Sequence, residues 1–102
     1  MRVKNTSENG VFDELIHAPL RLRICAMLSP VQWAEFALVR DRLQVADSVL
    51  SKHLKLLSEA GYVQIERFNK LGRSHVRLAL SQQGREAYVG HVAALHHITL
   101  GD

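Results

Sequence analysis

Residues 45–63, VADSVLSKHLKLLSEAGYV, have the pattern of an amphipathic helix that ends at a glycine. Leu50, Leu54 and Leu57 recur at the i, i+4, i+7 spacing that places side chains on one face of a helix. The opposite face carries hydroxyl and ammonium groups, from Ser48, Ser51, Lys52 and Lys55. Such a face is either an ordinary solvated surface or a surface that contacts a partner, and the segment alone fits both readings equally well.

The segments on either side of this helix complete a recognisable order of elements. Hydrophobic periodicity predicts helices over residues 11–17, from 19 to the proline at 30, and over 35–43, with a short turn at 44–46. After Gly61 the period changes to 2, which predicts a β-hairpin over residues 62–80 with Asn69 and Gly72 in its turn. Ser81 is predicted to cap a last helix. This order predicts a mainly α winged helix-turn-helix with a small β-hairpin, the wing, after a three-helix core.

The charge of the chain is concentrated in the predicted hairpin. The 102 residues, 47% of them hydrophobic, suffice for one domain, and their formal net charge is +3. The hairpin contains four cations and one carboxylate, so its net charge equals the net charge of the whole chain. The cations are Arg67, Lys70, Arg73 and Arg77, and the carboxylate is Glu66. A basic hairpin beside a polar helix favours nucleic acid as the partner, because the major groove of DNA admits one α-helix and a wing reaches the neighbouring backbone. Charges that protect a hairpin edge from aggregation are the alternative.

Cysteine content and hydropathy indicate the compartment. Cys25 is the single cysteine, so no internal disulfide is possible and a reducing compartment is favoured. No run reaches the roughly 18 apolar residues that span a bilayer, and the polar N-terminus lacks a signal peptide. We therefore expect a cytoplasmic protein without a membrane partner, with a mobile N-terminus over residues 1–10 and one domain over residues 11–102.

Three segments also resemble a known class of regulator. LIHAPLRLRICAML, FALVRDRLQVADSVLSKHLKLLSEAGYV and LALSQQGREAY are similar to winged-helix transcriptional regulators of the MarR and ArsR type, most closely the short single-domain MarR-like subgroup. The likeness covers residues 12–95. It implies a homodimer that binds double-stranded DNA sequence-specifically at a pseudo-palindromic operator, usually as a repressor. It places Asp47, Ser48, Val49, Ser51, Lys52, His53, Lys70, Arg73 and Ser74 at the DNA; the charge pattern adds Lys55, Arg67 and His75.

Two positions depart from the pattern of these relatives at the end of the helix that would meet the bases. Ala46 cannot cap the helix with its side chain, and a missing cap typically costs ~1 kcal/mol. Val49 cannot hydrogen-bond a base, although it could contact a thymine methyl group or simply pack. The base preference of relatives is therefore not transferable. His53 is expected to be half-buried, either bonded to nearby backbone or in contact with a DNA phosphate.

The first and last helices carry more apolar residues than one small core requires. We expect the surplus to form the dimer interface, with Phe12, Ile16, Tyr88, Val92 and Leu95 as its candidates. Trp33 could line a ligand pocket, pack under the wing or join that interface. A small-molecule effector is left open.

The remaining reactive residues favour structural roles. Cys25 is predicted to be a buried apolar side chain, with a redox sensor as the alternative. His91, His96 and His97 near Asp102 suggest the zinc site of ArsR-type relatives, but a five-residue spacing and the lack of a cysteine pair argue against it, so we expect no metal or other cofactor. No catalytic constellation is present, which predicts a non-enzyme. A winged helix used only for protein–protein association is the main rival interpretation.

Overall fold

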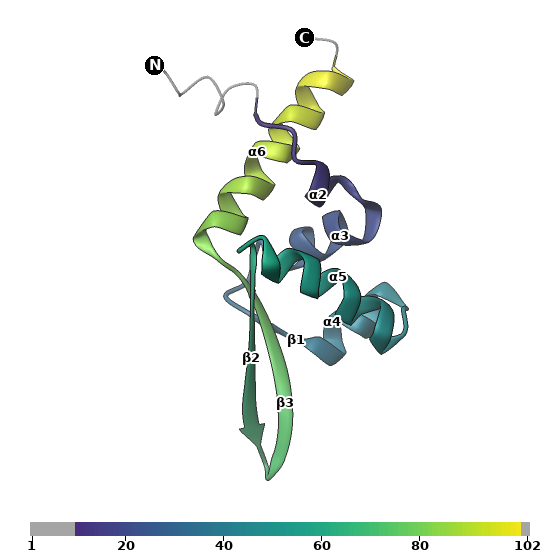
Figure 1. Ribbon diagram of the computed structural model, residues 1–102, viewed down its shortest axis with the longest axis vertical. Coiled ribbons are helices and arrows are strands. Elements are labelled where there is room, and N and C mark those ends of the chain that lie inside the picture. Colours follow the sequence, from purple (N-terminus) through teal and green to yellow (C-terminus); the bar gives the residue numbers. More distant parts are fainter. Residues whose placement is uncertain (1–9, 101–102) are drawn as a thin grey trace.

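The computed structural model describes residues 10–100, so the mobile N-terminus expected for residues 1–10 lies outside it except for Gly10. Four helices precede a long hairpin, and a fifth helix follows it (Figure 1). The elements are α2 (Glu14–His17), α3 (Pro19–Leu28), β1 (Ala34–Glu35), α4 (Phe36–Leu43), α5 (Asp47–Glu59), β2 (Val63–Lys70), β3 (Arg73–Leu80) and α6 (Gln82–Thr99). The hairpin projects from one end of the helical body and α6 extends from the other (Figure 1). None of the helices in this range is long and apolar enough to cross a membrane.

One apolar core joins the helices to the base of the hairpin. Leu50, Leu54 and Leu57 of α5 are each at most 2% exposed, which confirms the predicted stripe. Burying a leucine side chain stabilises a fold by about 1.5–3 kcal/mol. The stripe packs with Ile16, Ile24, Cys25, Leu28, Val39, Leu43, Val63, Leu78 and Leu80. The inner face of α5 is therefore committed to the core, which leaves its outer face to solvent.

The C-terminus of α5 has the predicted glycine cap. Gly61 adopts φ +83°, its N–H bonds the carbonyl of Ser58 at 2.9 Å, and the next N–H, of Tyr62, bonds that of Leu57 at 2.9 Å. These two bonds form a Schellman motif, which needs the left-handed conformation that glycine adopts without strain. The cap turns the chain directly from α5 into the first wing strand.

The first helix is shorter than predicted. It begins at Glu14, because the side chain of Asp13 accepts a hydrogen bond from the N–H of Ile16 at 3.0 Å and caps the helix there. Val11 precedes the helix and donates its N–H to the carbonyl of Gly90 in α6 at 3.0 Å. The helix predicted over residues 11–17 is therefore wrong for its first three residues, which run against α6 instead.

The sheet has three strands rather than the predicted two. Ala34 and Glu35 pair antiparallel with Leu78 and Arg77, giving the order β1-β3-β2. The predicted helix over residues 35–43 begins one residue later, at Phe36. A strand of two residues has no period to detect, and its pairing with β3 depends on residues far along the chain.

The wing turn also differs from the prediction. Leu71 (φ +53°) and Gly72 (φ +78°) are its two central residues, whereas Asn69 pairs with Ser74 inside the ladder. Two consecutive positive φ values are the signature of a type I′ turn, which prefers Asn-Gly or Gly-Gly. A left-handed conformation costs a residue with a Cβ about 1–2 kcal/mol. Leucine at position 71 is thus a poor choice for the turn that it occupies.

Candidate nucleic-acid interface

The outer face of α5 is polar along its whole length. Ser48, Ser51, Lys52 and Lys55 are all exposed, opposite the buried leucines. Val49 is 37% exposed, on the side of the helix that carries His53 one turn later. Hydroxyl groups therefore occupy the first half of the helix and ammonium groups follow them. This is an arrangement in which short side chains could approach base edges while lysines meet phosphates.

The N-terminus of α5 is held by an ion pair instead of a side-chain cap. Ala46 provides no capping hydrogen bond, as predicted. The carboxylate of Asp47 accepts a hydrogen bond from Nη1 of Arg40 at 3.0 Å, and Arg40 also bonds Asp41 at 2.9 Å. These hydrogen bonds, that to Asp41 foremost, raise the pKa of Arg40. Asp47, a predicted DNA contact, is thus engaged by α4, and its negative charge is offset at the surface where a phosphate would approach.

His53 is half-buried as predicted, but its partner is a side chain and not the backbone. Its Nδ1 lies 3.0 Å from Nη1 of Arg21, whose Nε donates to the carbonyl of Leu15 at 2.6 Å. Burial foremost, with the charges of Arg21 and Lys52, lowers the pKa of His53. A neutral imidazole that accepts at Nδ1 carries its proton on Nε2. Arg21, which had no signal in the sequence, therefore sets the tautomer of a residue on α5.

The wing cations divide between two faces of the hairpin. Strand residues alternate in direction, so the register places Arg67 and Ser74 on the face with Ile65 and Val76, which turns toward α5. The opposite face carries Lys70, Arg73 and His75. The predicted wing contacts therefore do not share one surface. Lys70 and Arg73 form the last pair of the ladder, next to the tip.

A carboxylate from outside the hairpin reduces its positive charge. Glu35 of β1 places Oε2 3.4 Å from Nζ of Lys70 and Oε1 3.2 Å from Nδ1 of His75. The charge balance predicted from residues 62–80 alone omits this group, because only the pairing of β1 with β3 brings it to the wing. Within residues 10–100, no carboxylate forms an ion pair with Arg67 or Arg73. These two arginines are the wing cations most available to phosphates.

Trp33 packs against the wing, one of the three places considered for it. Its ring lies 5.9 Å from that of Phe68, and the guanidinium of Arg77 sits 5.0 Å from its centroid. Arg77 also bonds Glu66 at 2.8 Å. Cation–π and stacking contacts of this kind are worth about 0.5–1 kcal/mol each at exposed sites. Arg77, the third wing arginine, therefore braces the hairpin and is not an available cation.

A groove separates α5 from the wing on the face that carries Arg67. It encloses about 400 Å³, with Phe36, Leu54, Ile65 and Val76 among its apolar lining and Ser51, Lys55, Ser58, Glu59 and Arg67 as its polar groups. Cations over an apolar floor suit the sugar–phosphate backbone of a nucleic acid, whose sugars are less polar than its phosphates. The outer face of α5, the groove and the wing face that carries Arg67 thus adjoin one another.

Comparison with known proteins identifies the family of the chain. A family model described as a winged helix DNA-binding domain matches residues 20–99. The chain belongs to this family. The expected winged-helix fold is therefore confirmed, and the description of the family supports DNA as the partner.

Individual relatives agree with the family assignment. The winged-helix domain is 27% identical over 79 residues to an uncharacterized protein of Methanocaldococcus jannaschii, covering 78% of this chain and 86% of that protein. A transcriptional regulator homologue of Pyrococcus horikoshii superposes with a TM-score of 0.82 at 21% identity, covering 87% of this chain and 88% of the other. The transcriptional regulator HlyU of Vibrio vulnificus gives 0.59 at 25% identity, covering 84% and 80%.

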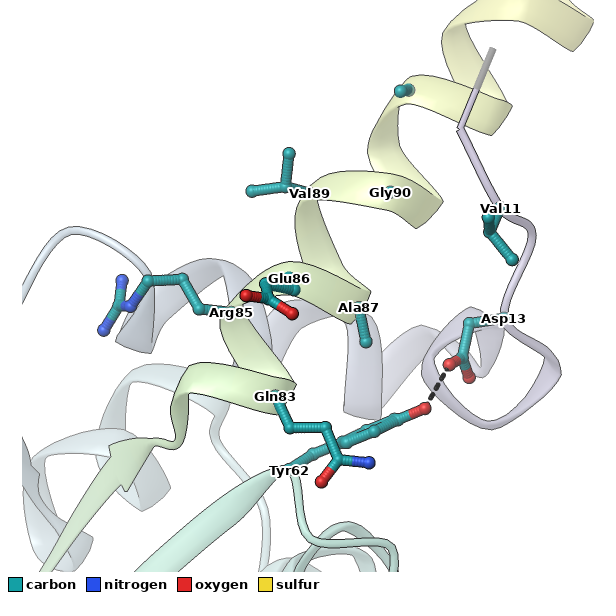
Figure 2. A pocket seen from close by; sticks show the side chains of 10 residues that line it. Val11, Asp13, Tyr62, Gln83, Arg85, Glu86, Ala87, Val89 and Gly90 are labelled. Atoms are coloured by element: carbon teal, nitrogen blue, oxygen red, sulfur yellow. Dashed lines mark hydrogen bonds between the residues drawn. The ribbon is translucent and has the colours of Figure 1, made fainter. Parts of the chain in front are cut away.

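The winged-helix domain has a second cavity, against α6 and away from the wing (Figure 2). It encloses about 610 Å³ between the N-terminal segment and α6, lined by Val11, Val89, Gly90 and Ala93 among others. Figure 2 shows Tyr62 and Asp13 at one end of it; the Tyr62 hydroxyl donates to Oδ2 of Asp13 at 2.6 Å. This hydrogen bond, with burial, raises the pKa of Tyr62 to about 12.

The predicted dimer residues do not all reach the surface of the winged-helix domain. Phe12 and Val92 are exposed, and Tyr88 and Leu95 are half-buried. Ile16 is 0% exposed in the protomer core, so its prediction as an interface residue is wrong. Val89 and Ile98 were not among the predicted residues, and each is 59% exposed on α6. Their signal was the continuation of the apolar spacing along the last helix.

His91 and Cys25 of the winged-helix domain are buried. His91 is fully buried and bonds the N–H of Asp13 through Nδ1 and His17 through Nε2. Burial foremost raises the pKa of Cys25 to about 12, which opposes thiolate formation. Within residues 10–100, no group of three His, Cys, Asp or Glu side chains is arranged to hold a metal ion. Asp102, considered beside these histidines, lies outside the described residues.

Proposed function

We propose that this protein is a homodimeric transcriptional regulator that binds a pseudo-palindromic operator and represses the adjoining gene. The observation that carries the proposal is the exposed row of Ser48, Ser51, Lys52 and Lys55 on α5, beside a wing whose Arg67 and Arg73 have no ion pair within the described residues. Helix α5 enters the major groove, and the wing lies on the adjacent minor groove or backbone. The relatives described as transcriptional regulators support regulation as the purpose of this binding.

The contacts divide by chemistry. Ser48 and Ser51 are short hydroxyl side chains that can donate to or accept from base edges, and Val49 offers an apolar contact to a thymine methyl group. Lys52 and Lys55, further along α5, meet phosphates together with the wing arginines. Phosphate contacts fix position and supply affinity, whereas base contacts are worth about 1–3 kcal/mol of discrimination each when well made.

The apolar side chains exposed on α6 support a dimer. Val89, Val92 and Ile98 are exposed along one helix, and Val11 and Phe12 of the N-terminal segment add to them. A stable interface buries about 1,200–2,000 Å² in total, and exposed apolar residues on an 18-residue helix are suited to provide its centre. A two-fold axis through α6 presents two copies of α5 to half-sites about 10 bp apart.

The test is selection of bound fragments from random DNA, followed by a salt titration on a selected duplex. The logarithm of affinity is expected to fall linearly with the logarithm of salt, with a slope of about −0.9 per phosphate contact. Arg73→Ala should make this slope shallower by about one contact on every sequence. Ser51→Ala should instead change which bases are preferred.

Arg23→Ala is the matched control, because it removes the same charge from an exposed position of α3, outside α5 and the wing. It should leave the slope unchanged. The proposal would be refuted if DNA affinity did not depend on salt concentration, or if neither Arg73→Ala nor Ser51→Ala altered binding. Either result would favour a winged helix used for protein association.

A further inference from the structure

The tip of the wing exposes a large apolar side chain. Leu71 is 95% exposed, more than any other large hydrophobic residue of the described range, where the next is Leu100 at 70%. It is the first of the two central turn residues between β2 and β3, at the far end of the hairpin from the helical body (Figure 1). Leu71 therefore contributes almost nothing to the core of this domain.

The backbone of Leu71 is unfavourable as well. Its φ of +53° is left-handed, a conformation that a side chain with a Cβ and γ-branching rarely adopts. The neighbouring Gly72, at φ +78°, is the residue type that such a turn requires. An Asn-Gly turn would serve the hairpin better on both counts. Positions that break local rules in this way are expected at functional sites, where the compensating contact lies outside the fold.

The surroundings of Leu71 indicate what that contact is. The two residues that pair across the end of the ladder, Lys70 and Arg73, are both cations, and Arg67 lies on the strand that leads to the tip. An apolar side chain next to cations suits a polyanion that has an apolar interior. DNA has this character, because its stacked bases lie beneath the phosphates. One leucine is too small an apolar surface to hold a protein on a bilayer, where amphipathic elements bury a whole helix face.

We propose, on the basis of the proposed DNA-binding function, that Leu71 is an apolar wedge that enters the minor groove beside the half-site and bends the duplex. Apolar side chains that wedge between base steps partly unstack them and kink DNA by about 20–90°. Unstacking is easiest at pyrimidine–purine steps such as TpA. The contribution of Leu71 to affinity therefore depends on how easily the base steps of the duplex deform. This dependence adds sequence preference without a base-specific hydrogen bond.

The experiment compares two duplexes of equal length, one of alternating T and A, which is rich in TpA steps, and one with A throughout one strand and T throughout the other, which has no pyrimidine–purine step and is stiff. Wild-type protein is expected to bind the TpA-rich duplex roughly tenfold more tightly and to bring its fluorescently labelled ends closer, because these steps unstack more easily. Leu71→Asn should remove most of this preference and the bending. It should keep the salt slope, because no charge is lost, and should raise the melting temperature, because Asn-Gly suits the turn.

Two further variants separate the apolar side chain from its backbone. Leu71→Met keeps an apolar side chain and should retain both preference and bending, whereas Leu71→Ala should lose them. Val31→Asn, at an exposed apolar residue in the loop before β1, is the control and should match wild type. Unchanged preference and bending in Leu71→Asn would overturn the wedge while leaving DNA binding intact. Loss of salt-dependent binding by the wild type to both duplexes would instead remove the proposed function itself. Leucine-dependent binding to anionic phosphatidylserine vesicles without DNA bending would also overturn the proposal.

Discussion

The backbone N–H of Asp13 donates a hydrogen bond of 2.9 Å to Nδ1 of His91, across 78 positions of sequence. The other ring nitrogen, Nε2, lies 3.2 Å from Nδ1 of His17. Because Nδ1 accepts, the buried imidazole is neutral with its proton on Nε2, which donates to His17. The N-terminal segment is thus fastened to α6 by a histidine that must remain unprotonated.

Protonation of His91 should destabilise the fold. Burial foremost, then the charge of His17, lowers its pKa in the folded state, while Asp13 and Glu14 act weakly in the opposite direction. Below about pH 6.5 the unfolded chain therefore binds a proton that the folded chain does not. The His91 contribution to the free energy of unfolding should be fully present above this pH and decline as the pH falls below it. Urea unfolding between pH 8 and pH 5 measures this decline.

His91→Asn provides the comparison, because an amide oxygen can replace Nδ1 as acceptor without titrating. Its free energy of unfolding should vary less with pH over the same range. His96→Asn, at an exposed position of the same helix, should retain the wild-type profile. A wild-type profile in His91→Asn would show that another group is responsible.

Substitution of alanine for two glycines of α6 should change the stability of the fold in opposite directions. A Cβ at Gly84 would lie 2.0 Å from the backbone carbonyl oxygen of Tyr62, which cannot move without disturbing the start of the wing. We expect Gly84→Ala to destabilise the fold by about 1–3 kcal/mol through overpacking. A Cβ at Gly90 would make only an ordinary contact, 3.5 Å from the backbone nitrogen of Val11. Because alanine has a higher helix propensity than glycine, Gly90→Ala should stabilise the fold by up to ~1 kcal/mol. Thermal unfolding measures both effects, and a lower melting temperature for Gly90→Ala than for Gly84→Ala would show that the contact with Tyr62 does not limit this helix.

Charged substitutions at the exposed apolar side chains of α6 test whether this helix forms the dimer interface. Val89 and Val92 are 59% and 40% exposed, so a carboxylate at either position should be tolerated by the protomer and not by an apolar interface. The double variant Val89→Glu, Val92→Glu should be monomeric in sedimentation, retain its helical content, and bind a palindromic operator much more weakly. Val31→Glu, which adds a carboxylate outside α6, should remain dimeric. A dimeric double variant would place the interface elsewhere.

Removal of the Glu35 carboxylate should strengthen DNA binding. Lys70 and His75 both contact this carboxylate, which must compete with phosphate for them. Glu35→Gln should raise affinity severalfold and steepen the salt dependence by up to ~0.9 per cation released. Glu66→Gln is the matched control on the same wing face, because its partner Arg77 stays stacked against Trp33 and Phe68. Weaker DNA binding by Glu35→Gln would mean that Glu35 orients the wing instead of competing with DNA.

Local patterns carried much of this architecture. The 3.6-residue hydrophobic period predicted helix α5, and the glycine at position 61 predicted its C-terminal cap. The change to period 2 after this glycine predicted the wing. Each of these features depends on neighbours within a few residues. The cap at Ser81 followed in the same way, and its hydroxyl accepts the N–H of Gly84 at 2.9 Å. The polar outer face of α5 was equally readable from spacing.

Other features depend on residues that only folding brings together. Glu35 reaches the wing through β1, Arg21 meets His53 between two helices, and Asp13 meets His91 at the crossing with α6. Ile16 shows the same limit, because whether an apolar side chain enters the core or the surface depends on the arrangement of all the helices. The sequence by itself determined helix α5 with its polar outer face, and the wing. Tertiary structure alone decided which charges remain available on that surface, because ion pairs form through space between residues that no local period connects.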